Sequence, residues 1–281
     1  MTTRIETATP IGGGSISRTM ILAAGSRRWF LKLNDHRLAE MFPAEEDGLR
    51  ALATCPEVRV PRVVGRGVVG EQAYLLLEYI ALQSLRHPKL GTAAGQALAA
   101  VHRLAGPDYG WHRDNFIGST PQHNTACATW PAFFARQRLL PQLELARRQG
   151  YRNRLLISEG ERLAAALPAL FAGYRPLPSL LHGDLWSGNA AADEAGTLTL
   201  MDPAVYFGDR EVDLAMSELF GGFPESFAAA YREAWPLDDG FAQRKTLYNL
   251  YHVLNHLNLF GGSYLDSAQR MIGSLLSELR G

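Results

Sequence analysis

The sequence has few of the features that would tie it to a membrane, a nucleic acid or an oxidising compartment. No uninterrupted apolar run is long enough to span a bilayer, and residues 1–7 lack the apolar core of a signal peptide. Lys plus Arg and Asp plus Glu number 28 each, so the formal net charge is zero and no general polyanion-binding surface is expected. We therefore expect a cytoplasmic protein that binds neither membranes nor nucleic acids.

Cysteine is also scarce. Cys55 and Cys127 share no metal-binding or redox spacing, and we expect both to be reduced thiols. The sequence shows no repeat of fixed period and no low-complexity segment. Hydrophobic residues nevertheless make up 47% of the 281 positions, enough for a sizeable core in one large domain or two lobes.

The hydrophobic pattern changes near residue 83. Residues 1–82 contain short β-type runs separated by glycine-rich turns. From Ser84 onward, apolar residues recur at helical spacing. We therefore predict an α+β fold with two lobes. A small lobe over 1–82 would hold an antiparallel β-sheet and one helix, and a larger, mainly helical lobe would span 83–281.

A His-x-Asp-x-x-x-x-Asn spacing follows a short apolar run at 182–189, and Asp202 lies beyond an alternating, strand-like run. Phosphoryl transfer needs a carboxylate that accepts the proton of the attacking hydroxyl, and oxygen ligands for Mg²⁺ on the nucleotide phosphates. Asp184 fits the first role, and Asn189 with Asp202 fits the second. A polar turn between two strands is the alternative for any short part of this stretch. The full set favours catalysis, with ATP and Mg²⁺ as cofactors.

A glycine cluster and a strand lysine fit the same chemistry. Gly13 and Gly14 precede a β-type run, and glycines let backbone N–H groups approach phosphate oxygens. A flexible hairpin is the alternative. Lys32 lies one hairpin later among apolar residues, where it either binds phosphates or points to water. Glu45 and Glu46 lie on a helix expected to begin near Pro43. Either one of them pairs with Lys32, or both lie on a solvated helix face.

The strand predicted at 72–80 is strongly apolar, so it should lie inside the sheet. Its end consists of Glu78, Tyr79 and Ile80 and leads out of the small lobe, where it would form the hinge between the lobes. Backbone groups of the hinge would read the edge of the adenine ring. We therefore place these three residues at the nucleotide, whatever their side chains are.

Three features of the larger lobe give structural predictions. Segment 109–122 is too polar and glycine-rich for a core element, so we expect a loop. Asp213 precedes an apolar helical run and would act as its N-cap; in kinase-like folds an acid here also bonds to the catalytic-loop backbone. His252 and His256 share a helix face within an aromatic stripe. We assign the stripe to core packing, because no partner follows at zinc-site spacing.

Several motifs together resemble one family. The motif His-Gly-Asp-Leu-Trp-Ser-Gly-Asn at 182–189, followed by a metal-type Asp with Pro after it, resembles the small-molecule branch of the kinase-like superfamily. Additional stretches resemble the fructosamine kinase (ketosamine-3-kinase) family, which is related to aminoglycoside phosphotransferases and choline kinases. These stretches are 114–122, 202–215, 219–223 and 248–261.

The resemblance implies a bilobal protein-kinase-like fold. It also implies ATP-dependent phosphorylation of the C3 hydroxyl of a ketosamine, after which the adduct sheds its amine, a deglycation. By resemblance, Asp184 matches the catalytic base, and Asn189 and Asp202 match the metal ligands. Lys32 matches the lysine that binds the nucleotide phosphates, with Glu45 as its partner.

Some alternatives stay open at this point. Trp186, two residues after the base, either stacks on the sugar or its amine substituent or packs the loop. The protein could instead be a kinase for another alcohol, such as an aminoglycoside, choline or homoserine, or a catalytically dead nucleotide-binding protein. The C-terminal motifs argue against the former, and the complete set of site residues argues against the latter. The expected substrate is a free or protein-linked ketosamine, and the protein is expected to be a monomer or a homodimer.

Overall fold

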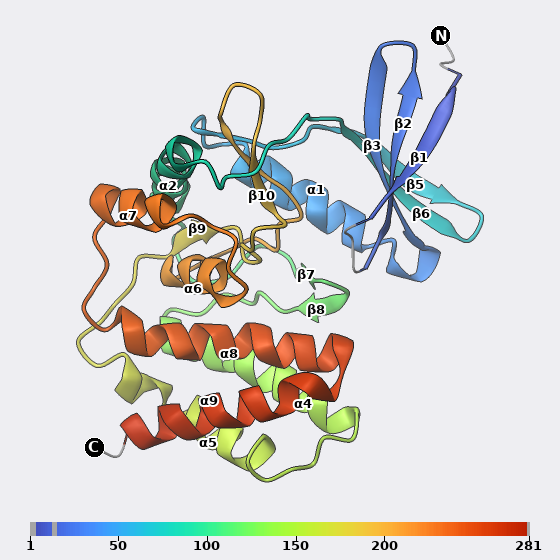
Figure 1. Cartoon of the computed structure of the whole chain (residues 1–281). Coiled ribbons are helices and arrows are strands. Elements are labelled where there is room, and N and C mark those ends of the chain that lie inside the picture. The colour runs from blue at the N-terminus through green and yellow to red at the C-terminus, as the bar shows by residue number, and fades with distance from the viewer. Residues whose placement is uncertain (1–3, 13–15, 280–281) are drawn as a thin grey trace.

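A computed structural model describes residues 4–12 and 16–279 of the chain. An N-terminal β-sheet lies beside one helix, and the rest of the chain forms a larger, mainly helical part that contains the C-terminus (Figure 1). The predicted α+β class, with a small antiparallel sheet followed by a helical lobe, is therefore confirmed.

The N-terminal sheet has five antiparallel strands in the order β1-β2-β3-β6-β5. They are β1 (Thr7–Ile11), β2 (Arg18–Ala24), β3 (Arg27–Asp35), β5 (Val63–Val69) and β6 (Gln72–Glu78). As predicted, β6 is an interior strand, since it pairs with both β3 and β5 and buries Ala73, Leu75 and Leu77. Strand β1 was not predicted. All five of its residues are exposed, so it lacks the apolar alternation that reveals a half-buried strand.

Two helical elements follow β3. They are the 3-10 helix η1 (His36–Leu38) and the helix α1 (Met41–Leu52). Pro43 lies in the first turn of α1, as predicted, where its missing N–H needs no intrahelical partner. Phe42 and Leu49 of α1 are buried in one cluster with the interior strand β6. This packing fixes α1 against the sheet.

The C-terminal lobe is built mainly from helices. They are α2 (Pro88–His102), α3 (Trp130–Phe133), the π-helix η2 (Phe134–Leu139), α4 (Leu140–Arg148), α5 (Ile157–Leu170), α6 (Glu211–Leu219), α7 (Glu225–Ala234), α8 (Phe241–Phe260), the 3-10 helix η3 (Gly262–Tyr264) and α9 (Leu265–Glu278). Helix α8 packs against α4, α6 and α9. Its Tyr248 and Tyr251 are fully buried, which confirms most of the predicted aromatic core, whereas Phe260 is 48% exposed and lies outside that core.

Three small sheets position the loops of this lobe. One consists of β10 (Ala190–Ala192), β11 (Leu198–Leu200) and β4 (Val58–Arg59), a second of β9 (Ser179–Leu181) and β12 (Tyr206–Gly208), and a third of β7 (Asn115–Ile117) and β8 (Thr120–Gln122). The third sheet corrects the prediction that 109–122 is a loop outside the core. Its polar side chains Asn115, Thr120 and Gln122 are buried. Asn115 and Gln122 donate hydrogen bonds to neighbouring backbone, which makes their burial tolerable, and composition alone does not reveal these bonds.

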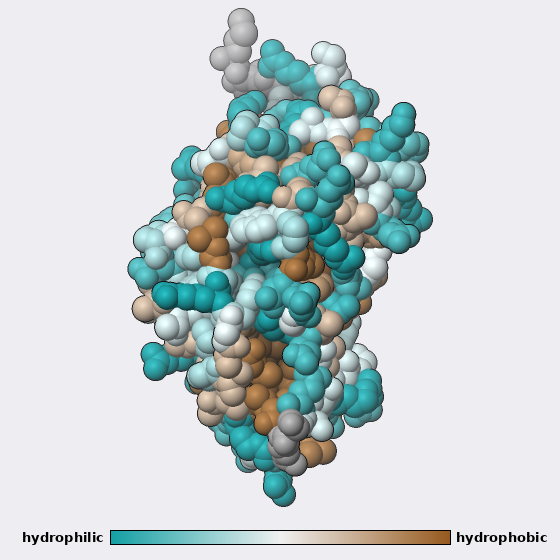
Figure 2. Space-filling view, turned by 90° about the vertical axis from the view of Figure 1, so that its left-hand side faces the viewer, coloured by the Kyte–Doolittle hydropathy of each residue, from teal (hydrophilic) through white to brown (hydrophobic). Residues whose placement is uncertain are grey.

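The surface in Figure 2 is mainly hydrophilic, with a patch of hydrophobic residues toward its lower end. Across residues 4–12 and 16–279, the helices do not combine the length and apolarity needed to cross a bilayer. Cys55 is buried and Cys127 partly buried, and both are free thiols.

Candidate active site

A buried histidine shapes the loop between β9 and β10. His182 Nε2 lies 2.8 Å from Met201 O, and His182 Nδ1 accepts a hydrogen bond from the Asp184 N–H at 3.2 Å. The neutral ring with its proton on Nε2 satisfies both contacts. Burial lowers the pKa of His182 and favours that neutral form. The histidine therefore ties the backbone of Asp184 to the residue that precedes Asp202.

Gly183 and Asp213 hold the same loop from the other side. Gly183 has a φ of +84°, and a Cβ there would clash with Ala204 O, so glycine is required. The Asp213 carboxylate accepts hydrogen bonds from the N–H groups of His182 and Gly183 at 2.7 and 2.9 Å. The expected bond from Asp213 to the loop is confirmed. The expected N-cap role is wrong, since α6 begins at Glu211 and Asp213 lies in its first turn.

Asp184 and Asn189 lie side by side in this loop. Asn189 Nδ2 donates to the backbone oxygen of Asp184 at 2.9 Å and to its Oδ2 at 3.2 Å. Burial, together with the nearby carboxylates of Asp202 and Asp213, raises the pKa of Asp184 to about 7. A carboxylate with a pKa near neutrality is well matched to accepting a proton at physiological pH.

Lys32 extends from β3 toward the same place. Its Nζ lies 2.6 Å from Glu45 Oε1 and also forms an ion pair with Asp202. Burial alone would lower the pKa of Lys32, but the two carboxylates outweigh it and raise this pKa, so the side chain stays cationic. The alternative in which Lys32 points to water is therefore wrong, and the predicted pairing with Glu45 is present.

Asp202 has an unusual backbone conformation. Its φ is +54°, and it is the only non-glycine residue of the described chain with a positive φ. Such a conformation costs on the order of 1 kcal/mol or more and persists where the surroundings impose it. Here the next residue, Pro203, packs against α1, where a Cβ on Gly48 would lie 3.0 Å from Pro203 Cγ. The Ala204 N–H donates to His182 O at 2.8 Å, which holds the segment on its other side.

The remaining predicted nucleotide contacts are described only in part. Gly13 and Gly14 lie outside the described residues. Glu78 ends β6, and its carboxylate accepts a hydrogen bond from Arg59 at 2.7 Å. Tyr79 and Ile80 follow in the connection to the C-terminal lobe, as expected for a hinge.

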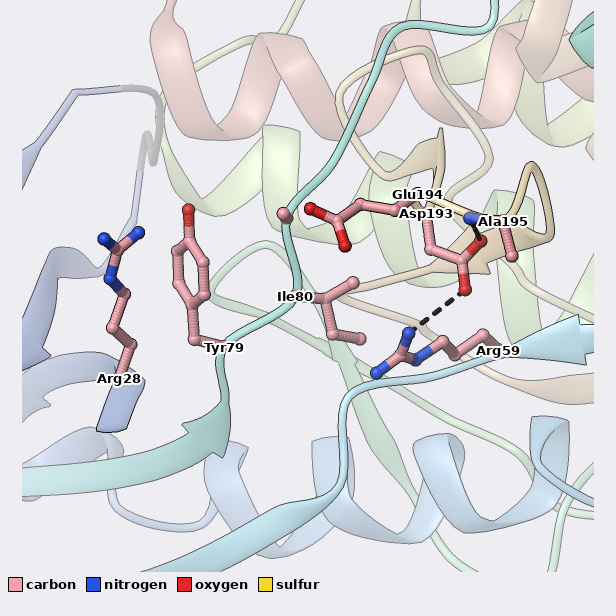
Figure 3. A pocket seen from close by; sticks show the side chains of 8 residues that line it. Arg28, Arg59, Tyr79, Ile80, Asp193, Glu194 and Ala195 are labelled. Carbon is pink, nitrogen blue, oxygen red and sulfur yellow. Dashed lines mark hydrogen bonds and ion pairs between the residues drawn. The ribbon is translucent and has the colours of Figure 1, made fainter. Parts of the chain in front are cut away.

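A pocket of about 450 Å³ opens on this connection (Figure 3). It is lined by Arg28, Arg59, Tyr79, Ile80, Ala81, Asp193, Glu194 and Ala195. Arg59 lies 3.1 Å from Asp193 Oδ2 and so bridges Glu78 to the turn between β10 and β11. The lining is largely charged and includes no residue of the catalytic loop, so we treat this pocket as a hinge crevice and not as the phosphate site.

Trp186 is partly exposed, and its ring lies over Gly188, where a Cβ would clash with the indole. The turn after α6 also packs on this loop, because a Cβ on Gly222 would clash with the side chain of Ser187. The indole thus has a packing contact within its own loop and also an exposed part. Both interpretations of Trp186 stay open.

The residues that support the site from outside were not predicted from the sequence. Asn115 Nδ2 donates to Val205 O at 2.8 Å, and Gln122 Nε2 donates to Ala204 O at 3.0 Å. Both side chains belong to the segment that was predicted to be a loop. Their amide groups within a glycine-punctuated stretch were the only signal available, and that signal does not say what they bond.

The arrangement defines a class of protein. A lysine–glutamate pair that faces a loop carrying Asp and Asn, with a further Asp after the next hairpin, is the arrangement of kinase-like phosphotransferases. A thermostable mutant of the aminoglycoside phosphotransferase APH(4)-Ia, solved in a ternary complex with ADP and hygromycin B, has the same fold. The TM-score is 0.63 at 17% identity, over 98% of this chain and 94% of that chain. The predicted kinase-like fold is confirmed.

The chain belongs to the fructosamine kinase family, whose sequence model matches residues 1–278. It is 43% identical over 274 residues to a probable ketoamine kinase of Synechocystis sp., covering 97% of this chain and 91% of that protein. The crystal structure of a candidate fructosamine-3-kinase from Haemophilus somnus 129PT matches with a TM-score of 0.88 at 30% identity. That match covers 98% of this chain and 92% of the other. The family predicted from the motifs is confirmed.

Proposed function

We propose that this protein transfers the γ-phosphoryl group of ATP to the C3 hydroxyl of a free or protein-linked ketosamine. The phosphorylated adduct would then shed its amine, and the outcome would be deglycation. The observation that carries the proposal is the convergence of Asp184 with the Lys32–Asp202 ion pair, reinforced by relatives that are named ketoamine kinases. A cytoplasmic location and a monomeric or homodimeric state stay predictions.

In this mechanism Asp184 orients the acceptor hydroxyl and takes its proton at a carboxylate oxygen. Asn189 restricts the rotation of that carboxylate through its hydrogen bond. Lys32, held by Glu45, supplies a fixed positive charge for the nucleotide phosphates. A sugar hydroxyl is a poor nucleophile at neutral pH, so most of the acceleration would come from positioning and charge neutralisation.

The residues present fit a magnesium ion. Asn189 uses its Nδ2 on Asp184, which leaves the amide oxygen to act as a ligand, and the Asp202 carboxylate is half exposed. Oxygen donors of this kind are the ligands that Mg²⁺ prefers. The influence of Asp202 on the pKa of Asp184 also shows that the two negative charges repel each other at this place. When bound, the ion would neutralise charge on the transferred phosphoryl group.

An ATP-consumption screen against a panel of ketosamines tests the proposal. The panel would contain fructosamine and ribulosamine adducts of an amino acid and of a protein, with aminoglycosides, choline and homoserine as competing alcohols. We expect consumption with ketosamines, a phosphate on C3 in the NMR spectrum of the product, and subsequent release of the amine. Turnover only with the competing alcohols would refute the acceptor. MgATP binding without turnover on any alcohol would favour a non-catalytic protein.

The metal role has its own test. Asp202→Ala should lose Mg²⁺-dependent nucleotide binding, because the negative charge of the phosphates is then left without its metal anchor. Calorimetric titration with ATP, with and without Mg²⁺, measures this directly. An unchanged affinity for MgATP together with normal turnover would remove Asp202 from the metal site.

A further inference from the structure

We propose that segment 109–124, which contains the β7–β8 hairpin, is a positioning element for the phosphate site. Its Trp111 anchors helix α1, and its buried amide side chains anchor the backbone after Asp202. The proposal rests on the proposed phosphoryl-transfer function, because the two elements that it aligns carry the partners of Lys32. The positioning residues themselves touch neither substrate nor metal.

The main contact with α1 is a short hydrogen bond from the indole to Asp47. Trp111 Nε1 donates to Asp47 Oδ2 at 2.7 Å, and His112 Nε2 lies 3.3 Å from the same oxygen. Asp47 lies on α1 two residues after Glu45, the partner of Lys32. A shift of the helix that breaks the bond to Trp111 would therefore also displace Glu45.

The indole of Trp111 packs against one of the two strands that hold the catalytic loop. Gly110 exchanges two backbone hydrogen bonds with Phe207 of β12, at 2.8 and 2.9 Å, and the ring of Trp111 packs on Phe207 with a centroid distance of 5.2 Å. Strand β12 pairs with β9, which leads directly into His182. The position of α1 thus depends on the same strand pair, β9 and β12, that holds Asp184.

The amide side chains of Asn115 and Gln122 hold the segment that follows Asp202, the other partner of Lys32. Gln122 Nε2 donates both to Ala204 O at 3.0 Å and to Asn115 Oδ1 at 2.8 Å, and Asn115 Nδ2 reaches Val205 O. Gln122 Oε1 accepts from the buried hydroxyl of Tyr251 at 2.7 Å. These bonds hold the carbonyls two and three residues after Asp202, whose positive φ needs such enforcement.

Lys32 bridges two carboxylates from different elements, Glu45 on α1 and Asp202 after β11. The bridge is maintained only while both elements keep their relative position. The segment 109–124 is hydrogen-bonded to both, at Asp47 on one and at Ala204 and Val205 on the other. It therefore sets the separation that Lys32 spans, and so the geometry offered to the nucleotide phosphates.

Two substitutions at Asp47 and one at Trp111 test the link to α1. Trp111→Phe keeps an aromatic ring but removes the donor, and Asp47→Ala removes the acceptor. Asp47→Asn keeps an oxygen that can accept from the indole. We expect the first two variants to lose roughly 10- to 150-fold in affinity for MgATP and in kcat/KM for ATP, the range for a lost hydrogen bond to a charged group. We expect Asp47→Asn to be close to wild type, and the KM for ketosamine to stay unchanged in all three.

Arg113→Ala is the matched control. Arg113 is in the same segment and lies 3.8 Å from Glu40 just before α1, but the Glu40 side chain is 80% exposed and the pair is long. This variant should bind MgATP like wild type. Equal losses in Arg113→Ala and Trp111→Phe would refute a specific role for the indole bond, as would wild-type affinity in Trp111→Phe.

A double-mutant cycle separates positioning from general packing. If Trp111 acts through Glu45, then Trp111→Phe should have little further effect on MgATP affinity in a Glu45→Gln background. Additive losses would show that Trp111 acts by another route and would overturn the proposal. Nucleotide binding is measured without an acceptor. A wild-type protein that phosphorylates no ketosamine would therefore refute the proposed function and leave this test intact.

Discussion

Two groups of buried charges, one in the core of the C-terminal lobe and one in the cleft, are organised differently. In the core, Arg244 donates to both oxygens of Glu211 at 2.7 and 2.9 Å, with the Arg244 side chain 6% exposed and that of Glu211 fully buried. Asp209 accepts from the Tyr248 hydroxyl at 2.5 Å and from the Glu211 N–H at 3.0 Å. Each carboxylate oxygen in this group has a donor from the protein itself.

The cleft group is unbalanced by comparison. Lys32 pairs with the carboxylates of Glu45 and Asp202, and the carboxylate of Asp184 lies near that of Asp202. Asp184 receives one side-chain hydrogen bond, from Asn189. A buried carboxylate whose oxygens all have donors is suited to stabilising a fold, whereas carboxylates with few donors are suited to binding a cation and to moving a proton. Four experiments test this difference.

The largest expected effect is on turnover. Asp184→Asn should lower kcat by ~10²–10⁴-fold, the usual loss for a positioned base, while MgATP binding stays largely intact. Near-normal turnover would show that Asp184 is not the base.

The same variant, Asp184→Asn, should be more stable than wild type at pH 8. The pKa of Asp184 is about 7 in the folded protein and lower in the unfolded chain. Protonation of Asp184 therefore favours the folded state, and this contribution to folding stability is lost as the pH rises through about 7. Thermal melts at pH 5 and pH 8 measure the effect.

The core group should respond in the opposite way. Arg244→Met leaves Glu211 buried without its charge partner, and removing one partner of a buried pair costs about 3–5 kcal/mol of folding stability. We expect the folded fraction to keep wild-type KM values, because the cleft is unchanged. Lys245→Ala, which removes an exposed pair with Glu218, is the control and should cost about 0–1 kcal/mol. Denaturant titration gives both values, and an equal cost for the two variants would contradict the comparison.

The pH dependence of the activity should come from the ionisation of Asp184 in the cleft. Asp184 accepts a proton only when it is ionised, so activity should fall about tenfold per pH unit below its pKa. That pKa is about 7 without ligands, partly because Asp202 lies nearby. A cation bound at Asp202 would offset this repulsion, so the acid limb of kcat/KM for the acceptor, measured with saturating MgATP, should lie below pH 7. A limb at or above pH 7 under these conditions would argue against a metal next to Asp184.

The smallest effect concerns acceptor choice. If the indole stacks on the acceptor, Trp186→Ala should raise the KM for ketosamine more than that for ATP. Stacking on a sugar or amine substituent contributes about 0.5–2 kcal/mol, which corresponds to a few-fold to ~30-fold in affinity. Trp186→Phe should retain part of it. A packing role would instead lower kcat for every acceptor and lower Tm, with the acceptor KM unmoved, and steady-state kinetics distinguish the two.

Much of the catalytic loop could be predicted from the sequence because its chemistry is local. His182, Asp184 and Asn189 lie within eight residues, and the structure shows the last two in contact. The pairing of Lys32 with an acid on the following helix was also predicted, and the resemblance to the kinase family selected Glu45. The strongly apolar composition of β6 correctly placed that strand inside the sheet.

The supports of the site could not be predicted, since they depend on partners distant in sequence. Nothing local to Trp111 indicates that its N–H reaches Asp47, which lies 64 positions earlier in the chain. Polarity placed Gln122 in an exposed loop, whereas its hydrogen bonds to Ala204 and Tyr251 keep it buried. Asp213 was predicted as a helix cap from its place before an apolar run, but the backbone donors of the catalytic loop take its carboxylate instead.

The Arg59 bridge at the hinge has a consequence for the rate of product release. Arg59 lies on β4, which pairs with β11, so it is attached to the C-terminal lobe. It would stay with that lobe if the N-terminal five-stranded sheet rotated away. Its bond to Glu78 at the end of β6 is then the one that opening would break. Both side chains are partly exposed, at 40% for Arg59 and 31% for Glu78, and dissolved salt weakens ion pairs that water reaches. Under the proposed function, concentrated salt would therefore ease the opening of the hinge, and ADP would leave faster than in dilute buffer.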